Sequence, residues 1–121
     1  MKYLCLVFID EKQLEALTPA ESQSLDDESL ASDDQFRERG YLLAAQALEP
    51  VRSAATVRVR NGRPIITDGP FTETREQVGG FVLLEARDID QAKALAAEIP
   101  VARMGAIEIR PVKELVRSPA Q

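Results

Sequence analysis

Two apolar runs constrain the fold of this chain most strongly: residues 3–9, which are continuously apolar, and residues 81–86, which only Glu85 interrupts. Their length and their β-branched and aromatic content are typical of buried strands, which need not alternate with polar residues. The first run resembles the apolar part of a signal peptide, but it is short, and Asp10 and Glu11 follow it where small cleavage-site residues would be expected. No apolar stretch approaches the roughly 20 residues of a membrane span. We therefore interpret both runs as buried strands of a globular domain.

A helix is predicted after the first strand. Thr18 and Pro19 are typical of a helix start, because a threonine hydroxyl can cap the helix and proline lacks only an N–H that would be unpaired there. Glu21 follows three residues after Thr18, as in a capping box. We expect the helix to cover residues 19–39 and to end at Gly40.

The apolar stripe of this predicted helix is thin. Ser29 and Ser32 occupy positions where a firmer stripe would be apolar, so we expect a helix that breaks near Asp26 and Asp27 and is not tightly packed along its whole length. Its carboxylates could form a cation site or a solvated helix face, and the second is the commoner arrangement. These acidic residues are Asp26, Asp27, Glu28, Asp33 and Asp34.

The middle of the chain contains a hairpin signal. Residues 56–60 alternate with period two, which predicts a half-exposed strand. Asn61 and Gly62 both tolerate positive φ and predict a tight turn. Residues 63–67 return as the partner strand, and Pro64 is expected at an outer edge because it has no N–H to donate.

The order of predicted elements is strand, helix, strand, inserted hairpin, strand, helix, strand. The second helix starts at Asp88 or Asp90 and stops at Pro100, and the last strand covers residues 106–112. Two βαβ units in tandem predict the α+β class, as a ferredoxin-like sandwich with an inserted β-hairpin and its helices on one face of the sheet. We expect one domain over residues 1–117 and a frayed tail over residues 118–121.

The other face of the predicted sheet would be uncovered. Val57, Val59, Val82 and Leu84 are expected to contribute to an apolar face that is too large to remain in water. A second copy of the chain would cover it, so the sequence predicts a homodimer.

Composition excludes several classes of function. The 121 residues include 15 Lys and Arg against 20 Asp and Glu, for a formal charge of −5, and the scattered bases argue against a nucleic-acid partner. The chain has no His, which excludes His-based acid–base catalysis and His-ligated metal. Cys5 is the single cysteine, so an intramolecular disulfide is impossible and a reduced, cytoplasmic setting is expected. We predict no cofactor, no metal site and no membrane partner.

The segment from Asp68 to Glu76 combines turn residues, an aromatic ring and carboxylates. Asp68 can act as the internal acceptor of a turn, or it can face a pocket as a general base or ligand anchor. Gly69 permits a backbone conformation that other residues resist, and Pro70 fixes its own φ. The candidate catalytic residue is therefore Asp68, and Gly69, Pro70 and Phe71 are candidate ligand-binding residues beside it.

Further candidates lie on either side of this segment. Glu73 and Glu76 would share a face if the segment were helical and could divide acid and base roles, whereas Arg75 beside them could form an ordinary ion pair. Gly79 and Gly80 predict close backbone approach or a bulge, and Gly80 is also a candidate ligand contact.

Arg110 near the end of the last strand is the remaining candidate. Its guanidinium could bind an anionic substrate in bidentate fashion, or it could pair with an acidic residue of a loop. Both interpretations remain open from the sequence.

The chain resembles the DGPF-domain branch of the YCII-related proteins. The resemblance is carried by the run Asp68–Glu76 with Gly79 and Gly80, and further agreement comes from Met1–Tyr3, Leu17–Pro19, Thr56–Gly62 and Ile107–Val112. It implies a dimeric α+β barrel, in which two ferredoxin-like units pack sheet against sheet, in a small cytoplasmic bacterial protein. Other YCII-related proteins carry a His-Asp pair proposed as catalytic, and this chain, lacking His, cannot contain it.

Three functions follow as alternatives. The first is binding of a small polar or anionic molecule near the Asp68 loop. The second is an enzyme of the dimeric α+β barrel type that uses Asp68 as a carboxylate general base. The third is a protein-interaction module linked to sigma-factor regulation, since many DGPF-type relatives are encoded near such factors.

Overall fold

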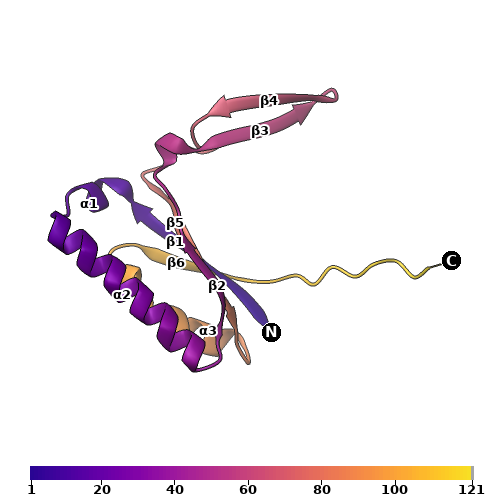
Figure 1. Cartoon of the computed structure of the whole chain (residues 1–121). Helices are drawn as coiled ribbons and strands as arrows, with labels where there is room; N and C mark the ends of the chain where they lie inside the picture. The colour runs from indigo at the N-terminus through magenta and orange to yellow at the C-terminus, as the bar shows by residue number, and fades with distance from the viewer. Residues whose placement is uncertain (121) are drawn as a thin grey trace.

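A computed structural model describes residues 1–120 of the chain. Its main sheet has four strands in the order β2-β5-β1-β6, and all three neighbouring pairs are antiparallel. Two α-helices, α2 and α3, lie on one side of this sheet, and the β3–β4 hairpin stands apart from it (Figure 1). This arrangement confirms the predicted ferredoxin-like α+β fold with an inserted hairpin. The strands are β1 (Lys2–Asp10), β2 (Leu42–Ala47), β3 (Ala55–Arg60), β4 (Arg63–Asp68), β5 (Glu76–Glu85) and β6 (Ala106–Pro111), and the helices are α1 (Glu11–Glu15), α2 (Pro19–Glu38) and α3 (Ile89–Ala96), with short 3₁₀ turns η1 (Val51–Ser53) and η2 (Pro100–Arg103).

The core lies between the sheet and the two long helices. Strands β1 and β5 form its centre, because every second residue of each strand points to the helices. The largest side chains buried there almost completely are Tyr3, Phe36 and Leu84. Burying a large apolar side chain contributes roughly 1.5–3 kcal/mol, so these contacts hold the helices on the sheet.

Helix α2 begins as predicted and is continuous. The Thr18 hydroxyl accepts from the Glu21 N–H at 3.1 Å, and the Glu21 carboxylate accepts from the Thr18 N–H at 2.9 Å. Gly40 follows the helix with φ of 82°, the left-handed conformation typical of the residue after a helix. The expected break near Asp26 and Asp27 is wrong: both residues lie within the unbroken helix, because an acidic run on an exposed helix face costs too little to interrupt it.

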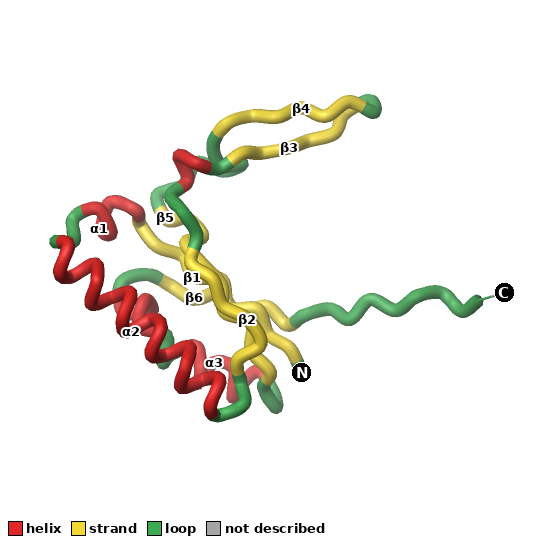
Figure 2. The backbone as a smooth tube through the Cα atoms, in the orientation of Figure 1, coloured by secondary structure: helices red, strands yellow, loops and turns green. Residues whose placement is uncertain are grey.

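The hairpin also has the predicted turn. Asn61 has φ of 52° and Gly62 has φ of 73°, so both adopt the positive φ that a tight hairpin turn requires. Strands β3 and β4 pair only with each other, in a separate two-stranded sheet. Figure 2 shows this ribbon projecting away from the body of the molecule.

The predicted composition of the uncovered sheet face is wrong. Val82 and Leu84 are 6% and 0% exposed and belong to the core beneath the helices, whereas Val57 and Val59 lie on the separate hairpin. The reason is that a continuously apolar strand gives no alternation from which to infer which residues face the helices. The register places five other large apolar side chains on the opposite face: Leu4, Leu6, Phe8, Phe81 and Leu83.

Two smaller features complete the fold. The short helix α1 was not predicted, and its N-terminus is capped by Asp10, whose carboxylate accepts from the Lys12 N–H at 3.0 Å. After β6, residues 112–120 contain no helix or strand and extend away from the body (Figure 1). The predicted frayed tail includes Gln121, which lies outside the described residues. No helix within residues 1–120 combines the length and the apolar character needed to cross a membrane.

Candidate functional site

A cavity of about 590 Å³ lies between helix α2 and the helix-facing side of the sheet. Its volume falls within the range of typical small-molecule sites. Helix α2 contributes Ser22, Leu25, Asp26, Ser29, Ser32 and Asp33 to its wall. The sheet contributes Val7, Ile9, Ala45, Gly79, Gly80 and Val82.

The cavity exists because the middle of α2 presents short polar side chains to the sheet. Ser29, Ser32 and Asp33 are half-buried and lie on the same side of the helix as Leu25 and Phe36. Phe36 packs into the core and is 1% exposed, so the helix is anchored at its C-terminal end. Serine and aspartate have short side chains, and space therefore remains beneath residues 22–33 of the helix.

Two glycines form part of the cavity floor. A Cβ at Gly80 would lie 2.8 Å from the backbone oxygen of Gln46, and a Cβ at Gly79 would lie 2.8 Å from a methyl carbon of Ile9. The pairing of β1 with β5 skips Gly79, which is the extra residue of a β-bulge. The prediction of a bulge or close backbone approach at these glycines is confirmed. The two glycines therefore allow a neighbouring strand and the Ile9 side chain to approach closely at the cavity floor.

Asp33 is a half-buried carboxylate of the cavity wall whose surroundings shift its pKa. Burial raises its pKa above the ordinary value, the negative charge of Asp34 raises it further, and the positive charge of Arg37 partly opposes both. Within residues 1–120 the Asp33 carboxylate takes part in no hydrogen bond or ion pair, whereas Asp34 pairs with Arg37 at 2.9 Å. A half-buried carboxylate without a protein partner is a typical acceptor for a ligand's hydrogen-bond donor or positive charge.

The edge of the cavity is apolar. Leu14, Leu30 and Leu48 line it and are 36%, 63% and 50% exposed. They come from α1, from α2 and from the segment after β2. A ligand would therefore meet apolar contacts at the entrance and floor, and polar contacts along the helix.

Among the residues proposed from sequence as catalytic or ligand-binding, Gly80 alone lines this cavity. Asp68, Gly69, Pro70 and Phe71 lie at the base of the hairpin. The Asp68 side chain accepts no hydrogen bond from the described residues; the turn is held instead by Gly69, whose N–H donates to the Ala54 oxygen at 2.7 Å and whose oxygen accepts from the Thr56 hydroxyl at 3.0 Å. Arg58 lies over the Phe71 ring at 4.8 Å, which fixes that ring against the hairpin.

The other predicted charged residues are also on the surface. Glu73 lies in a non-helical loop and Glu76 begins β5, so the two do not share a helix face. Arg75 pairs with Asp10 at 3.3 Å instead of with either glutamate. Arg110 pairs with Glu108 of its own strand at 3.5 Å. The structure therefore does not bring the sequence-proposed residues together.

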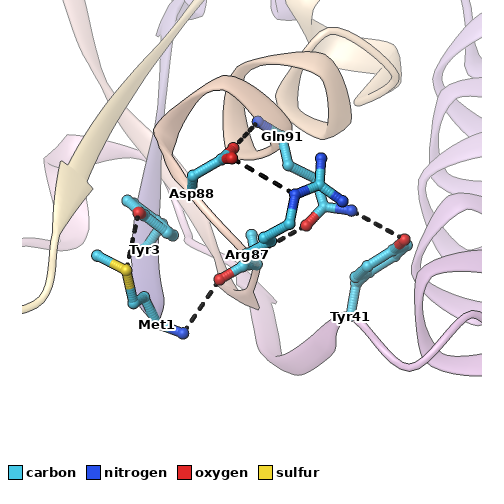
Figure 3. Close-up of polar contacts among 7 residues, drawn as sticks. Met1, Tyr3, Tyr41, Arg87, Asp88 and Gln91 are labelled. Carbon is cyan, nitrogen blue, oxygen red and sulfur yellow. Dashed lines mark hydrogen bonds and ion pairs between the residues drawn. The ribbon is translucent and has the colours of Figure 1, made fainter.

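A second group of polar side chains lies at the other end of the sheet (Figure 3). The Asp88 carboxylate accepts from the Gln91 N–H at 2.8 Å and caps α3, while the Gln91 amide accepts from the Arg87 N–H at 2.7 Å and donates to the Tyr41 hydroxyl at 3.1 Å. Because these groups bond to one another, they stabilise the start of α3.

Sequence reasoning assigned Asp26 and Asp33 to a possible cation site or a solvated helix face, and it did not identify either of them, or Ser22, as a cavity residue. The available signal was the interruption of the apolar stripe of α2 at Ser29 and Ser32, which was interpreted as loose packing. A polar stripe at helical spacing that faces a buried strand pair indicates a cavity in this protein.

Comparison with known proteins identifies relatives of the whole chain. The family model of the YCII-related domain matches residues 1–116. A protein of Rhizobium meliloti (strain 1021), itself uncharacterised, is 33% identical over 114 residues, which cover 93% of this chain and 92% of that protein.

Proposed function

This chain belongs to the YCII-related family, and we propose that it binds a small organic molecule in the cavity between α2 and the sheet. The observation that carries the proposal is the inward polar stripe of α2, where Ser29, Ser32 and Asp33 line the same cavity as Gly79 and Gly80 of the sheet. Filling this space with leucine would be the simpler way to stabilise a helix on a sheet. Polar residues at such positions commonly serve function at the expense of stability.

The lining indicates the chemistry of the ligand. Asp26 and Asp33 are the charged residues in the wall, and no basic side chain among the described residues accompanies them. An anionic ligand would be repelled by these carboxylates. The cavity favours a molecule with an apolar body and a positively charged or hydrogen-bond-donating group, such as an alkyl or aryl amine or amino alcohol.

A thermal-shift screen of such amines tests the proposal. A ligand at about 100 times its dissociation constant should stabilise the protein by about 2.7 kcal/mol. Ser29→Leu would fill the cavity and should abolish the shift. Ser24→Leu makes the same change on the exposed side of the same helix and should leave the shift intact. Equal responses of the two variants would contradict binding at this cavity.

The charge of the ligand can be tested separately. Asp33→Asn keeps the size of the side chain but removes its charge, so it should weaken binding of a cationic amine by about tenfold or more while binding of a neutral alcohol analogue changes little. Asp34→Asn, one residue along and outside the cavity, is the matched control. If the two variants bind the amine alike, the Asp33 carboxylate is not its partner.

Catalysis is the second candidate function, and the raised pKa of Asp33 favours it. A half-buried carboxylate with a raised pKa is a stronger base than an exposed one and could remove a proton from a bound substrate. The general base of such an enzyme would still be a carboxylate, as in the hypothesis drawn from the sequence, but it would be Asp33 instead of Asp68. Turnover should then rise with pH through the pKa of Asp33, and Asp33→Asn should abolish it while leaving binding of a neutral substrate measurable.

The role predicted for Asp68 can be tested in the same screen. Asp68→Asn keeps the shape of the side chain and removes its charge. A ligand response that falls in this variant would support an anchoring role for Asp68, and an unchanged response would leave the α2 cavity as the site.

A further inference from the structure

A smaller cavity of about 210 Å³ adjoins the cavity beneath α2. We call the larger one the inner cavity and the smaller one the outer cavity. Four residues line both of them: Ile9, Leu14, Leu48 and Gly79. Figure 1 shows α1, which carries Leu14, at the end of the sheet from which the hairpin projects. A ligand in the inner cavity therefore has a route past apolar side chains into the outer one.

The outer cavity carries charges of both signs. Arg52 of η1 and Glu15 of α1 line it, and within residues 1–120 neither side chain takes part in a hydrogen bond or an ion pair. Glu11 lines it as well, but its carboxylate already accepts from the Val51 N–H at 2.9 Å. This bond joins α1 to η1 and so holds two sides of the outer cavity together. One basic and one acidic side chain remain there for a ligand.

The inner cavity, in contrast, has charged side chains of one sign. Asp26 and Asp33 lie in its wall, and no basic residue among those described accompanies them. A ligand that complements both cavities has a cationic group at one end, an apolar chain in the middle, and a head group with both charges at the other end. Polar groups placed in this way fix the orientation of a ligand whose body makes apolar contacts. Diamino carboxylic acids, such as lysine and ornithine, have this arrangement of groups.

We propose that the ligand is a diamino carboxylic acid, an inference that rests on the proposed binding of an amine beneath α2. Its distal ammonium pairs with the Asp33 carboxylate, and its methylene chain lies along Leu14 and Leu48. In the outer cavity the Arg52 guanidinium binds the α-carboxylate, while the Glu15 carboxylate accepts from the α-ammonium. Arg52 and Glu15 are exposed, so they select the head group and add little to the affinity.

Three probes separate the two ends of such a ligand. They are lysine, 6-aminohexanoate, which is lysine without its α-amino group, and 1,5-diaminopentane, which is lysine without its carboxylate. Isothermal titration calorimetry measures the dissociation constant of each probe. Arg52→Gln should raise this constant about three- to fivefold for lysine and 6-aminohexanoate, as expected for an exposed ion pair, and should not raise it for 1,5-diaminopentane. Arg63→Gln makes the same change of charge on the exposed hairpin, outside both cavities, and should leave all three constants unchanged.

Glu15→Gln tests the other half of the head group. It should raise the dissociation constant of lysine by a similar factor and leave that of 6-aminohexanoate unchanged, because 6-aminohexanoate has no α-ammonium. Glu15 and Arg52 are both exposed, so neither substitution should prevent folding, which circular dichroism can verify. An equal effect of Glu15→Gln on the two probes would overturn the assignment of the α-ammonium.

Asp33→Asn separates this inference from the function on which it rests. It should weaken binding of all three probes, whereas Asp34→Asn should not. If the probes respond to Asp33→Asn but lysine binds Arg52→Gln and Arg63→Gln equally well, the outer cavity does not hold the head group. The inference is then overturned, while amine binding beneath α2 stands. If no probe distinguishes Asp33→Asn from Asp34→Asn, both the inference and the proposed function are wrong.

Discussion

Gly69, at the base of the hairpin, has a backbone conformation that residues with a side chain rarely adopt. Its φ is 98°, in the region that favours glycine, and space around it is open, so the constraint is conformational and not steric crowding. The neighbouring Asp68 carboxylate has no hydrogen-bond partner among the described residues. The turn residues around Gly69 predicted an unusual backbone conformation there. That the Asp68 carboxylate accepts no hydrogen bond in this turn could not be predicted from its neighbours in the chain, because the turn is held by bonds between Gly69 and the residues at the start of β3.

Replacing these two neighbours should therefore have unequal effects. Gly69→Val should lower the free energy of unfolding by about 1–3 kcal/mol, because a β-branched residue is strained at positive φ. Asp68→Ala should change it by less than about 0.5 kcal/mol, since an exposed side chain without a partner contributes little. Urea denaturation of the two variants measures both values. Similar losses in the two proteins would show that the turn is not constrained at Gly69.

Cys5 is buried at the centre of β1, as a small apolar residue would be. Burial raises the pKa of its thiol to about 11. The pKa in the unfolded chain is lower, so above about pH 9 the unfolded state loses a proton that the folded state keeps. The stability of the parent should therefore be unaffected by this group below pH 9 and should fall by on the order of 2–3 kcal/mol as the pH rises to 11.

Cys5→Ala isolates this contribution. The variant is expected to be less stable than the parent at neutral pH because of the cavity it creates, but the difference between the two proteins should shrink as the pH rises from 9 to 11. A difference that stays constant across this range would mean that the thiol ionises as readily in the folded protein as in the unfolded chain.

At the scale of elements, the start of helix α2 could be predicted from sequence, whereas its continuity and the cavity beneath it could not. Its start followed from Thr18 and Glu21, because capping depends on residues that are neighbours in the chain. Its continuity through Asp26 and Asp27, and the cavity beneath Ser29, depend on packing against β1 and β5. Long-range contacts of this kind have no local signature, so the polar stripe could be seen in the sequence but not its position over the glycine floor.

We expect the polar stripe of α2 to lower the free energy of unfolding of the protein. Ser29→Leu should raise the free energy of unfolding by about 1 kcal/mol, because a leucine there would contact the apolar floor around Val7 and Val82. Ser24→Leu, on the outer side of the helix, should change it by no more than about 0.5 kcal/mol. Thermal and urea denaturation provide the comparison. A loss of stability in Ser29→Leu would show that the space beneath the helix is too small to accept a side chain.

At the scale of the whole molecule, the sequence predicted the order of elements and the fold class but not which apolar residues face water. Val82 and Leu84 were assigned to the open sheet face, yet they lie in the core, because β5 is apolar on both sides. The same two-sided character leaves Phe81 and Leu83 on the open face. A chain built this way has a cavity on the helix side of its sheet and an apolar surface on the other.

The central claim is that a small molecule binds between α2 and the sheet, and amide chemical shifts test it most directly. The amine that gives the largest thermal shift in the screen should be titrated into ¹⁵N-labelled protein. We predict that the largest changes occur at Gly79 and Gly80 of the floor and at Ser29 and Asp33 of α2, with small changes at Gly69. Changes confined to residues 68–76, with the floor and α2 unaffected, would contradict the account and place the binding site at the base of the hairpin.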